Sequence, residues 1–205
     1  MIESIKIKIK LFLNYFKNKK ENTLEFKTKK LKINKESDVE RWSNDNVFHV
    51  NWNERTIIMA SFLNEKANII EFGAGNMFVK TILKTNQLYT ASDIIKRFSE
   101  TIVCDLNKPI ELDLKLFDTA IFSGVFEYVY DIEAIFKKLF DSDVNQVILS
   151  YSCADIVNLS RLKNGWLSDL KKDELENIFH KFKYTIKNYQ EWENQSIYNL
   201  IKDIE

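Results

Sequence analysis

The chain has 205 residues, enough for one α/β domain with a full hydrophobic core. Its composition of 45% hydrophobic, 13% aromatic and 29% charged residues is typical of a globular protein, and no apolar run approaches the roughly 18 residues of a membrane span. Cys104 and Cys153 are too few for a disulfide framework or a metal site, and no signal-peptide pattern opens the chain. We therefore expect a cytoplasmic protein without a bound metal.

Charge is unevenly distributed although the formal sum is zero. Residues 1–35 contain eleven Lys and three Glu, so about +8 in this segment is balanced by about −8 in the remainder. Lysines surround an apolar helical face formed by Ile2, Ile5, Ile9, Phe12 and Phe16. We favour packing of this face on the domain or on another subunit of an oligomer. Peripheral contact of residues 1–35 with a membrane or a nucleic acid is the alternative.

The first part of the chain is expected to cover the main domain. Residues 1–44 are predicted to form a basic helical extension or lid, and residues 45–205 the main domain itself. Within the extension, residues 23–33 alternate apolar and polar side chains, which predicts a short hairpin or an edge strand. Residues 37–42 and 53–63 have the patterns of helices.

From residue 67 onward, the sequence predicts β-strands interspersed with α-helices. Continuous apolar runs predict buried parallel strands at residues 67–72, 87–92, 101–106, 117–123 and 145–152. Amphipathic runs predict helices at residues 77–84, 131–140 and 171–182. Two alternating runs, 183–192 and 195–203, predict an antiparallel pair that closes the sheet.

Two of the four glycines, Gly73 and Gly75, lie between the first of these strands and the first helix. A strand that turns directly into a helix leaves free backbone N–H groups at the positive end of the helix dipole, and these attract an anion. Glycine permits positive φ and close approach of a ligand; the alternative is a tight turn that needs glycine for conformation alone. A dinucleotide site would require a third glycine where this chain has Phe78, which argues against NAD.

The sequence EFGAGNM resembles the first motif of class I S-adenosylmethionine-dependent methyltransferases, acidic-x-G-x-G-x-G, with Met77 in place of the last glycine. Asp93 ends an apolar strand where that family has an acid that accepts hydrogen bonds from both ribose hydroxyls. Asp105 matches the acid that accepts from the adenine amino group. Residues 117–139 resemble the fourth strand and the following segment, where this chain has Phe126, Glu127 and Tyr128 in place of the usual Leu-Glu-His.

The resemblance extends from about residue 45 to the end of the chain. It implies an α/β, Rossmann-like sheet of seven mostly parallel strands, with an antiparallel last strand and helices on both faces. It also implies S-adenosyl-L-methionine as the cofactor and S-adenosyl-L-homocysteine as its product. The residues expected to bind the cofactor are Glu71, Gly73, Gly75, Asn76, Asp93, Ile94, Asp105, Leu106, Ser123 and Gly124.

Methyl transfer from a sulfonium depends on alignment and exclusion of water more than on a nucleophilic side chain. A hydroxyl acceptor nevertheless benefits from a base, for which the candidates are Tyr128 and His49, the latter in residues 48–55, which are also expected to act as a lid. The alternatives are a packed or exposed His49 and a Tyr128 that serves as cavity wall, because an ordinary tyrosine has a pKa of about 10. Glu127 is expected to give structural support.

Arg161 and Trp166 are the candidates for binding the methyl acceptor. Arg161 offers a planar fork for phosphate or carboxylate, and Trp166 offers a flat face for a sugar or an aromatic ring. The alternatives are a solvated Arg161 and a Trp166 that anchors a loop.

These residues predict a methyltransferase for a small molecule. The preferred acceptor is a hydroxyl of a nucleotide-linked or phosphorylated sugar in the synthesis of a bacterial surface polysaccharide such as a capsule, with no nucleic-acid partner. One alternative is an RNA or protein methyltransferase that uses the basic extension as an electrostatic guide. The other is a catalytically inactive scaffold with the same fold.

Overall fold

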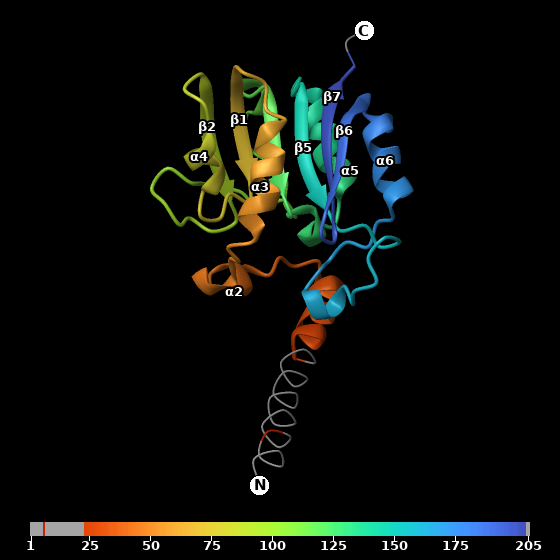
Figure 1. The fold of residues 1–205 in the computed structure, drawn as a ribbon. Helices are drawn as coiled ribbons and strands as arrows, with labels where there is room; N and C mark the ends of the chain where they lie inside the picture. The colour runs from red at the N-terminus through yellow and green to blue at the C-terminus, as the bar shows by residue number, and fades with distance from the viewer. Residues whose placement is uncertain (1–5, 7–22, 204–205) are drawn as a thin grey trace.

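The computed structural model describes residue 6 and residues 23–203. The apolar face predicted near the N-terminus, from Ile2 to Phe16, lies outside the described residues. Residues 23–44 lie across the end of a central sheet at which its parallel strands finish (Figure 1). The sheet, its helical layers and this segment together position the candidate site.

The sheet has seven strands in the order β3-β2-β1-β4-β5-β7-β6. The strands are β1 (Ala67–Phe72), β2 (Gln87–Asp93), β3 (Ile102–Val103), β4 (Thr119–Ser123), β5 (Gln146–Tyr151), β6 (Tyr184–Trp192) and β7 (Gln195–Lys202). Strands β1 to β5 are parallel, whereas β7 runs antiparallel to both β5 and β6. This confirms the predicted mostly parallel sheet with an antiparallel last strand, although β3 is shorter than its apolar run predicted.

Helices cover both faces of the sheet because successive residues of its central strands point to opposite sides. On one face, Ile69 of β1 packs in a cluster with Met59 of α3 (Trp52–Ser61), beside α4 (Phe78–Ile82). On the other face, Ile70 packs in a cluster with Phe136 of α5 (Ile132–Asp141) and with α6 (Lys172–Lys181). A strand that is apolar at every position is therefore buried on both sides.

Short helical segments make up the rest of the described structure. They are α2 (Val39–Trp42) and the 3₁₀ turns η1 (Asp45–Val47), η2 (Leu114–Leu116), η3 (Phe126–Tyr128) and η4 (Leu162–Asn164). Asp38 caps the N-terminus of α2, because its carboxylate accepts a hydrogen bond from the backbone N–H of Arg41 at 3.1 Å. The predicted helices at residues 37–42 and 53–63 are thus present in shorter form.

Residues 23–34 form a helix, so the predicted hairpin or edge strand is wrong. The alternation that suggested a strand includes Phe26 and Ile33, and both of these are exposed. Leu24, Thr28 and Leu31 recur at the helical spacing of four and three residues, with Thr28 fully buried and the two leucines half-buried. Packing on one helical face, rather than alternation, determines the structure of this segment.

The described part of the extension is fixed to the domain by hydrogen bonds. The Tyr130 hydroxyl shares its one proton between the carbonyl oxygens of Leu31 and Glu36, at 2.8 and 3.0 Å. Arg41 Nη1 donates to the carbonyl of Asn164 at 2.7 Å. The division of the chain at residue 45 stays a prediction. Within residues 23–203, no helix is long and apolar enough to cross a membrane, and no group of three or more His, Cys, Asp or Glu could hold a metal ion.

Candidate functional site

A cavity of about 440 Å³ opens at the carboxyl ends of β1, β2 and β4. Because β2 and β4 flank β1 on opposite sides, the direction of the strand order reverses here, and open α/β sheets bind ligands at such a point. The segment around α2, the start of α3 and the turn between β6 and β7 complete the wall. All ten residues predicted to bind the cofactor line this cavity, as do His49, Tyr128 and Trp166.

The chain bends sharply between β1 and α4 through left-handed backbone conformations. Gly73, Gly75 and Met77 have φ of 68°, 51° and 59°. Met77 occupies the position of the third motif glycine and is buried beside Ala74 and Ala91, so an apolar side chain is accommodated where glycine is usual. Helix α4 is only five residues long, so the dipole that we expected behind this bend is weaker than the sequence suggested.

Protein side chains lie against both glycines of the bend. A Cβ added to Gly73 would lie 2.5 Å from Val125 Cγ2, and one added to Gly75 would lie 2.7 Å from Phe48 Cε1. The sequence left two reasons for these glycines open, a ligand that approaches the backbone and a tight turn that needs glycine for its conformation. In the structure, positive φ and the closeness of Val125 and Phe48 already require them.

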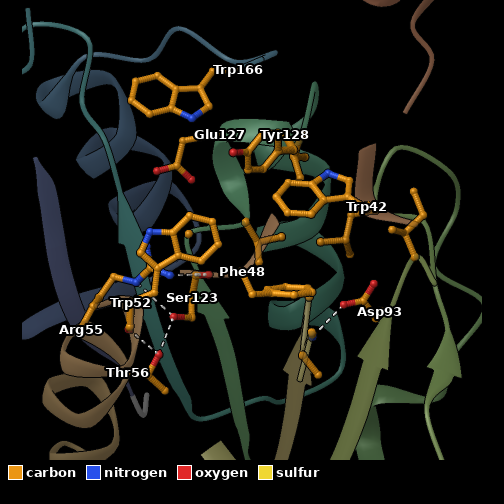
Figure 2. Close-up of a pocket in the computed structure, with 18 of the residues that line it drawn as sticks. Trp42, Phe48, Trp52, Arg55, Thr56, Asp93, Ser123, Glu127, Tyr128 and Trp166 are labelled. Atoms are coloured by element: carbon orange, nitrogen blue, oxygen red, sulfur yellow. Dashed lines mark hydrogen bonds between the residues drawn. The ribbon is translucent and has the colours of Figure 1, made fainter. Parts of the chain in front are cut away.

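Asp93, at the end of β2, connects the bend to the next loop (Figure 2). Its Oδ2 accepts the backbone N–H of Gly75 at 2.8 Å, and its Oδ1 accepts the backbone N–H of Ile95 at 2.9 Å. Arg97 Nη1 lies 3.3 Å from Oδ1, and the Arg97 guanidinium stands 4.8 Å from the centre of the Phe48 ring. The carboxylate is therefore oriented by backbone donors and remains on the cavity wall.

Asp105 follows β3 by two residues and also lines the cavity. Its Oδ1 accepts hydrogen bonds from the Ser37 hydroxyl at 2.7 Å and from the backbone N–H of Asn107 at 3.0 Å. The neighbouring Asp38 is 5% exposed, and its Oδ2 has no hydrogen-bond partner among the described residues. This region thus presents an oriented carboxylate beside a second, partly unsatisfied one.

Glu71 of β1 lines the cavity as a buried carboxyl group that is only 4% exposed. Burial raises its pKa from 4.5 to about 8, against the opposing effect of a hydrogen bond from the Tyr89 hydroxyl. Burial also raises the pKa of Tyr89, so the phenol keeps its proton and acts as the donor. Glu71 is therefore largely neutral near pH 7.

Arg55 of α3 brings a buried positive charge to the cavity. Its Nε donates to the Ser123 hydroxyl and its Nη2 to the Ser123 carbonyl, both at 3.2 Å, and it stands over the rings of Trp52 and Trp192 at 5.7 and 5.9 Å. Burial lowers the pKa of Arg55, and the charge of Glu127 opposes that shift. The side chain fixes the end of β4 next to Gly124, where an added Cβ would lie 2.6 Å from Nη1.

Glu127 in η3 is 1% exposed and lines the cavity. Its Oε1 accepts the backbone N–H of Ser152 at 2.9 Å and Nε2 of Gln195 at 2.8 Å. Its Oε2 has no partner among the residues that the structure describes. Ser152 follows β5 and Gln195 begins β7, so one carboxylate joins both to η3.

The two candidate bases lie on the wall in different settings. His49 is exposed, and its ring meets that of Trp52 edge-on at 5.0 Å between centroids. The ring of Tyr128 meets Trp42 edge-on at 4.8 Å, and burial raises the pKa of its phenol. A higher pKa makes the phenolate rarer at neutral pH, which favours Tyr128 as cavity wall.

Solved structures with the same fold exist although no protein-family model and no curated protein matches the sequence. A Burkholderia thailandensis 1,6-didemethyltoxoflavin-N1-methyltransferase, with its substrate and S-adenosylhomocysteine bound, is 13% identical over 75% of this chain and 78% of its own, with a TM-score of 0.58. A second solved structure is that of the O-methyltransferase NcsB1 from neocarzinostatin biosynthesis, in complex with S-adenosylmethionine and 2-hydroxy-5-methyl naphthoic acid. It is 12% identical in sequence, the match covers 73% of this chain and 55% of NcsB1, and the TM-score is 0.55. The chain has the class I methyltransferase fold.

A third structure with this methyltransferase fold is the N-terminal domain of EvdMO1, determined in the presence of S-adenosylhomocysteine and D-fucose. It is 12% identical over 77% of this chain and 84% of its own, with a TM-score of 0.51. At such low identity these likenesses establish the arrangement of strands and helices, and the residues of this chain must support any further statement.

Arg161 is not among the residues that line the cavity of this methyltransferase fold. Its Nε donates to the Ser168 carbonyl at 2.6 Å, its Nη1 to the Ser152 carbonyl at 2.7 Å, and its Nη2 to the Tyr151 hydroxyl at 3.0 Å. Asp169 lies 3.1 Å from Nε. These contacts occupy the planar fork, contrary to the expectation that it binds a phosphate or carboxylate of the acceptor.

Trp166 does line the cavity, and the Arg161 guanidinium lies 4.8 Å from the centre of its ring. Arg161, which does not itself line the cavity, therefore holds the ring of Trp166 in position. The sequence patterns did not point to other wall residues, above all Phe48, Arg55 and Gln195. No local pattern distinguishes Gln195, whereas the four tryptophans, all of which line the cavity, were a usable signal.

Proposed function

We propose that this protein is an S-adenosylmethionine-dependent methyltransferase with a small-molecule acceptor. The observation that carries the proposal is the Asp93 carboxylate, which is held against the Gly75 N–H at 2.8 Å on the wall of the cavity. S-adenosylmethionine supplies an activated methyl group on a sulfonium centre. The chain's own residues bind and orient the reactants and exclude water.

The donor and acceptor groups of the wall suit an adenosyl ligand. A carboxylate can accept about four hydrogen bonds. Asp93 accepts two from backbone N–H groups and a longer one from Arg97. One ribose hydroxyl can therefore donate to the remaining position, and a second ribose hydroxyl can replace Arg97 as a donor. Asp105 and the unsatisfied Oδ2 of Asp38 provide acceptors for an amino group such as that of adenine. The ring of Phe48 lies on Gly75 and would have to move for a ligand to use the face of this glycine.

Aromatic side chains give this cavity an apolar cover. Trp42, Phe48 and Trp52 come from the segment that precedes the first strand, and Trp166 and Trp192 come from the second half of the chain. Such a cover keeps water from the reacting groups and strengthens their electrostatic interactions. We propose that the segment before the first strand acts as a lid, and the aromatic side chains that it contributes to the cavity support this proposal.

For the acceptor we favour a sugar hydroxyl of surface-polysaccharide synthesis. The indole rings support it, because sugars stack their C–H faces on flat aromatic surfaces. A neighbour of the same fold was crystallised in the presence of D-fucose, which is compatible with this class of acceptor. The occupied fork of Arg161 removes the argument for a phosphorylated sugar.

Calorimetric titration with S-adenosylhomocysteine tests the cofactor site. The wild-type chain should bind it, and Asp93→Asn should weaken binding by about 100-fold, because the loss of two hydrogen bonds to a charged group costs roughly 3 kcal/mol. Asp173→Asn, on the exposed first turn of α6, is the matched control and should bind like the wild type. No binding by the wild type, or equal affinity of folded Asp93→Asn, would contradict the proposal.

A further inference from the structure

Two side-chain oxygens on one part of the cavity wall have no donor among the described residues. They are Oε2 of Glu127 and Oε1 of Gln195. Both residues line the cavity, and the Glu127 side chain is almost completely buried. Buried polar atoms are almost always paired in native proteins, so these two atoms call for donors that the protein itself does not supply here.

The orientation of the two side chains is determined by their mutual contact. Gln195 Nε2 donates to Glu127 Oε1 at 2.8 Å, and the backbone N–H of Ser152 donates to the same oxygen at 2.9 Å. A flipped amide would place two acceptor oxygens against each other. The remaining oxygens of this pair can only accept, so a ligand that satisfies both must offer at least two donors.

Indole rings line the same cavity as these two oxygens. Figure 2 shows the Glu127 carboxylate between the indoles of Trp166 and Trp52, on the other side of the cavity from Asp93. Trp192 lies at the end of β6, three residues before Gln195. A cavity that is lined by acceptor oxygens and aromatic faces fits a ring that has apolar C–H faces and O–H groups on its edge.

The charge of this region favours a neutral ligand over a cation. The negative charge of Glu127 is offset by the buried guanidinium of Arg55, which lines the same cavity. An ammonium ligand would bring a second cation close to Arg55, whereas hydroxyl groups satisfy the two oxygens without adding charge.

We propose that Glu127 and Gln195, with the indoles of Trp52 and Trp166, form a subsite that binds a neutral hydroxylated ring such as a monosaccharide. This proposal rests on the proposed function, because the ring bound here is the methyl acceptor. It assigns to Glu127, which the sequence suggested only as structural support, direct hydrogen bonding to the ligand.

Tryptophan fluorescence reports on this subsite because all four tryptophans of the chain line the cavity. The probes are D-fucose, D-glucose and L-rhamnose, with benzylamine as a cationic ring and benzoate as an anionic ring. Each is titrated with and without saturating S-adenosylhomocysteine, and calorimetry supplies the dissociation constants. At least one monosaccharide should bind more tightly than benzylamine and benzoate.

The decisive variant is Glu127→Gln, which keeps an acceptor for the Ser152 N–H and replaces the free oxygen by an NH₂ group. It should weaken monosaccharide binding at least about tenfold, because the ligand then meets a donor in place of an acceptor. Its affinity for S-adenosylhomocysteine should change less than about twofold. Gln195→Met removes the second oxygen and should also weaken the monosaccharide, while Glu133→Gln, on the outer surface of α5, is the matched control.

The possible outcomes separate this proposal from the proposed function. Absence of S-adenosylhomocysteine binding contradicts the function, and the titrations of the free protein still decide the subsite. Failure of the wild type to bind any of the monosaccharides, tighter binding of benzylamine, or unchanged monosaccharide affinity in both folded variants would each overturn the subsite.

Discussion

Replacement of Glu71 by Gln should change how the stability of the protein depends on pH. Glu71 is buried, accepts a hydrogen bond from Tyr89, and has a pKa raised by burial from 4.5 to about 8. Between these two values the unfolded chain has released the proton that the folded chain still holds. The free energy of unfolding therefore decreases as pH rises through this window.

The width of the pH window sets the magnitude. Each pH unit costs roughly 1.4 kcal/mol while the folded chain holds one extra proton. From pH 4.5 to about 8 the accumulated loss from Glu71 is about 5 kcal/mol, and above pH 8 it stays constant because both states are then ionised. Glu71→Gln has no proton to lose, so it removes this contribution while its amide oxygen still accepts from Tyr89.

Urea unfolding from about pH 5 to about pH 8.5 measures the effect. The stability of Glu71→Gln relative to the wild type should increase from about pH 5 to about pH 8 and then level off. Glu133→Gln, which is exposed on α5, should keep a nearly constant difference from the wild type. A constant difference for Glu71→Gln as well, or one that moves in the opposite direction, would refute the assignment of a neutral buried carboxyl group.

Three further substitutions test the bend, the cover and the loop that carries Trp166. Gly73→Ala should destabilise the fold by about 1–3 kcal/mol in urea unfolding, because the added Cβ would lie 2.5 Å from Val125 and the backbone at this position has a φ of 68°. A variant as stable as the wild type would show that the bend has a different conformation. Phe48→Ala should bind S-adenosylhomocysteine more tightly in calorimetry, because the ring on Gly75 no longer has to move; weaker binding would make Phe48 part of the cofactor site. Arg161→Ala should destabilise the fold by about 2–4 kcal/mol in urea unfolding, because the hydrogen bonds of Arg161 to buried groups are lost. Its affinity for S-adenosylhomocysteine should not change. A variant of unchanged stability that binds S-adenosylhomocysteine more weakly would contradict a purely structural role of Arg161.

Much of the fold could be predicted because its signals are local. Strands β1 and β5 are largely apolar runs, and their residue patterns correctly indicated burial on both faces. Strand β7 is an exception, because its sequence alternates although it is buried on both faces between β5 and β6. Residues 23–34 are another exception, because the exposed Phe26 and Ile33 produce the alternating pattern of a strand within a helix. An apolar side chain on the surface has no local signature that distinguishes it from one in the core.

The positions of the predicted cofactor residues could also be anticipated, because they follow the ends of strands. Parallel strands end at the same edge of a sheet, so Gly73, Asp93 and Ser123 were bound to meet once the strands were known. What occupies the faces of the glycines was not predictable. Phe48 and Val125 reach them from separate parts of the chain, and only packing brings them there.

The sequence by itself determined the strands, the sharp bend at the glycines and the acids at the strand ends, because periodicity and turn chemistry act over a few neighbouring residues. Only the tertiary structure decided that Arg161 supports Trp166 from outside the cavity and that Glu127 meets Gln195 within it. Glu127 and Gln195 are 68 residues apart in the chain, and they meet because β7 inserts between β5 and β6. Such contacts depend on how the whole sheet assembles, since a side chain's local sequence does not specify which distant donor or acceptor will face it.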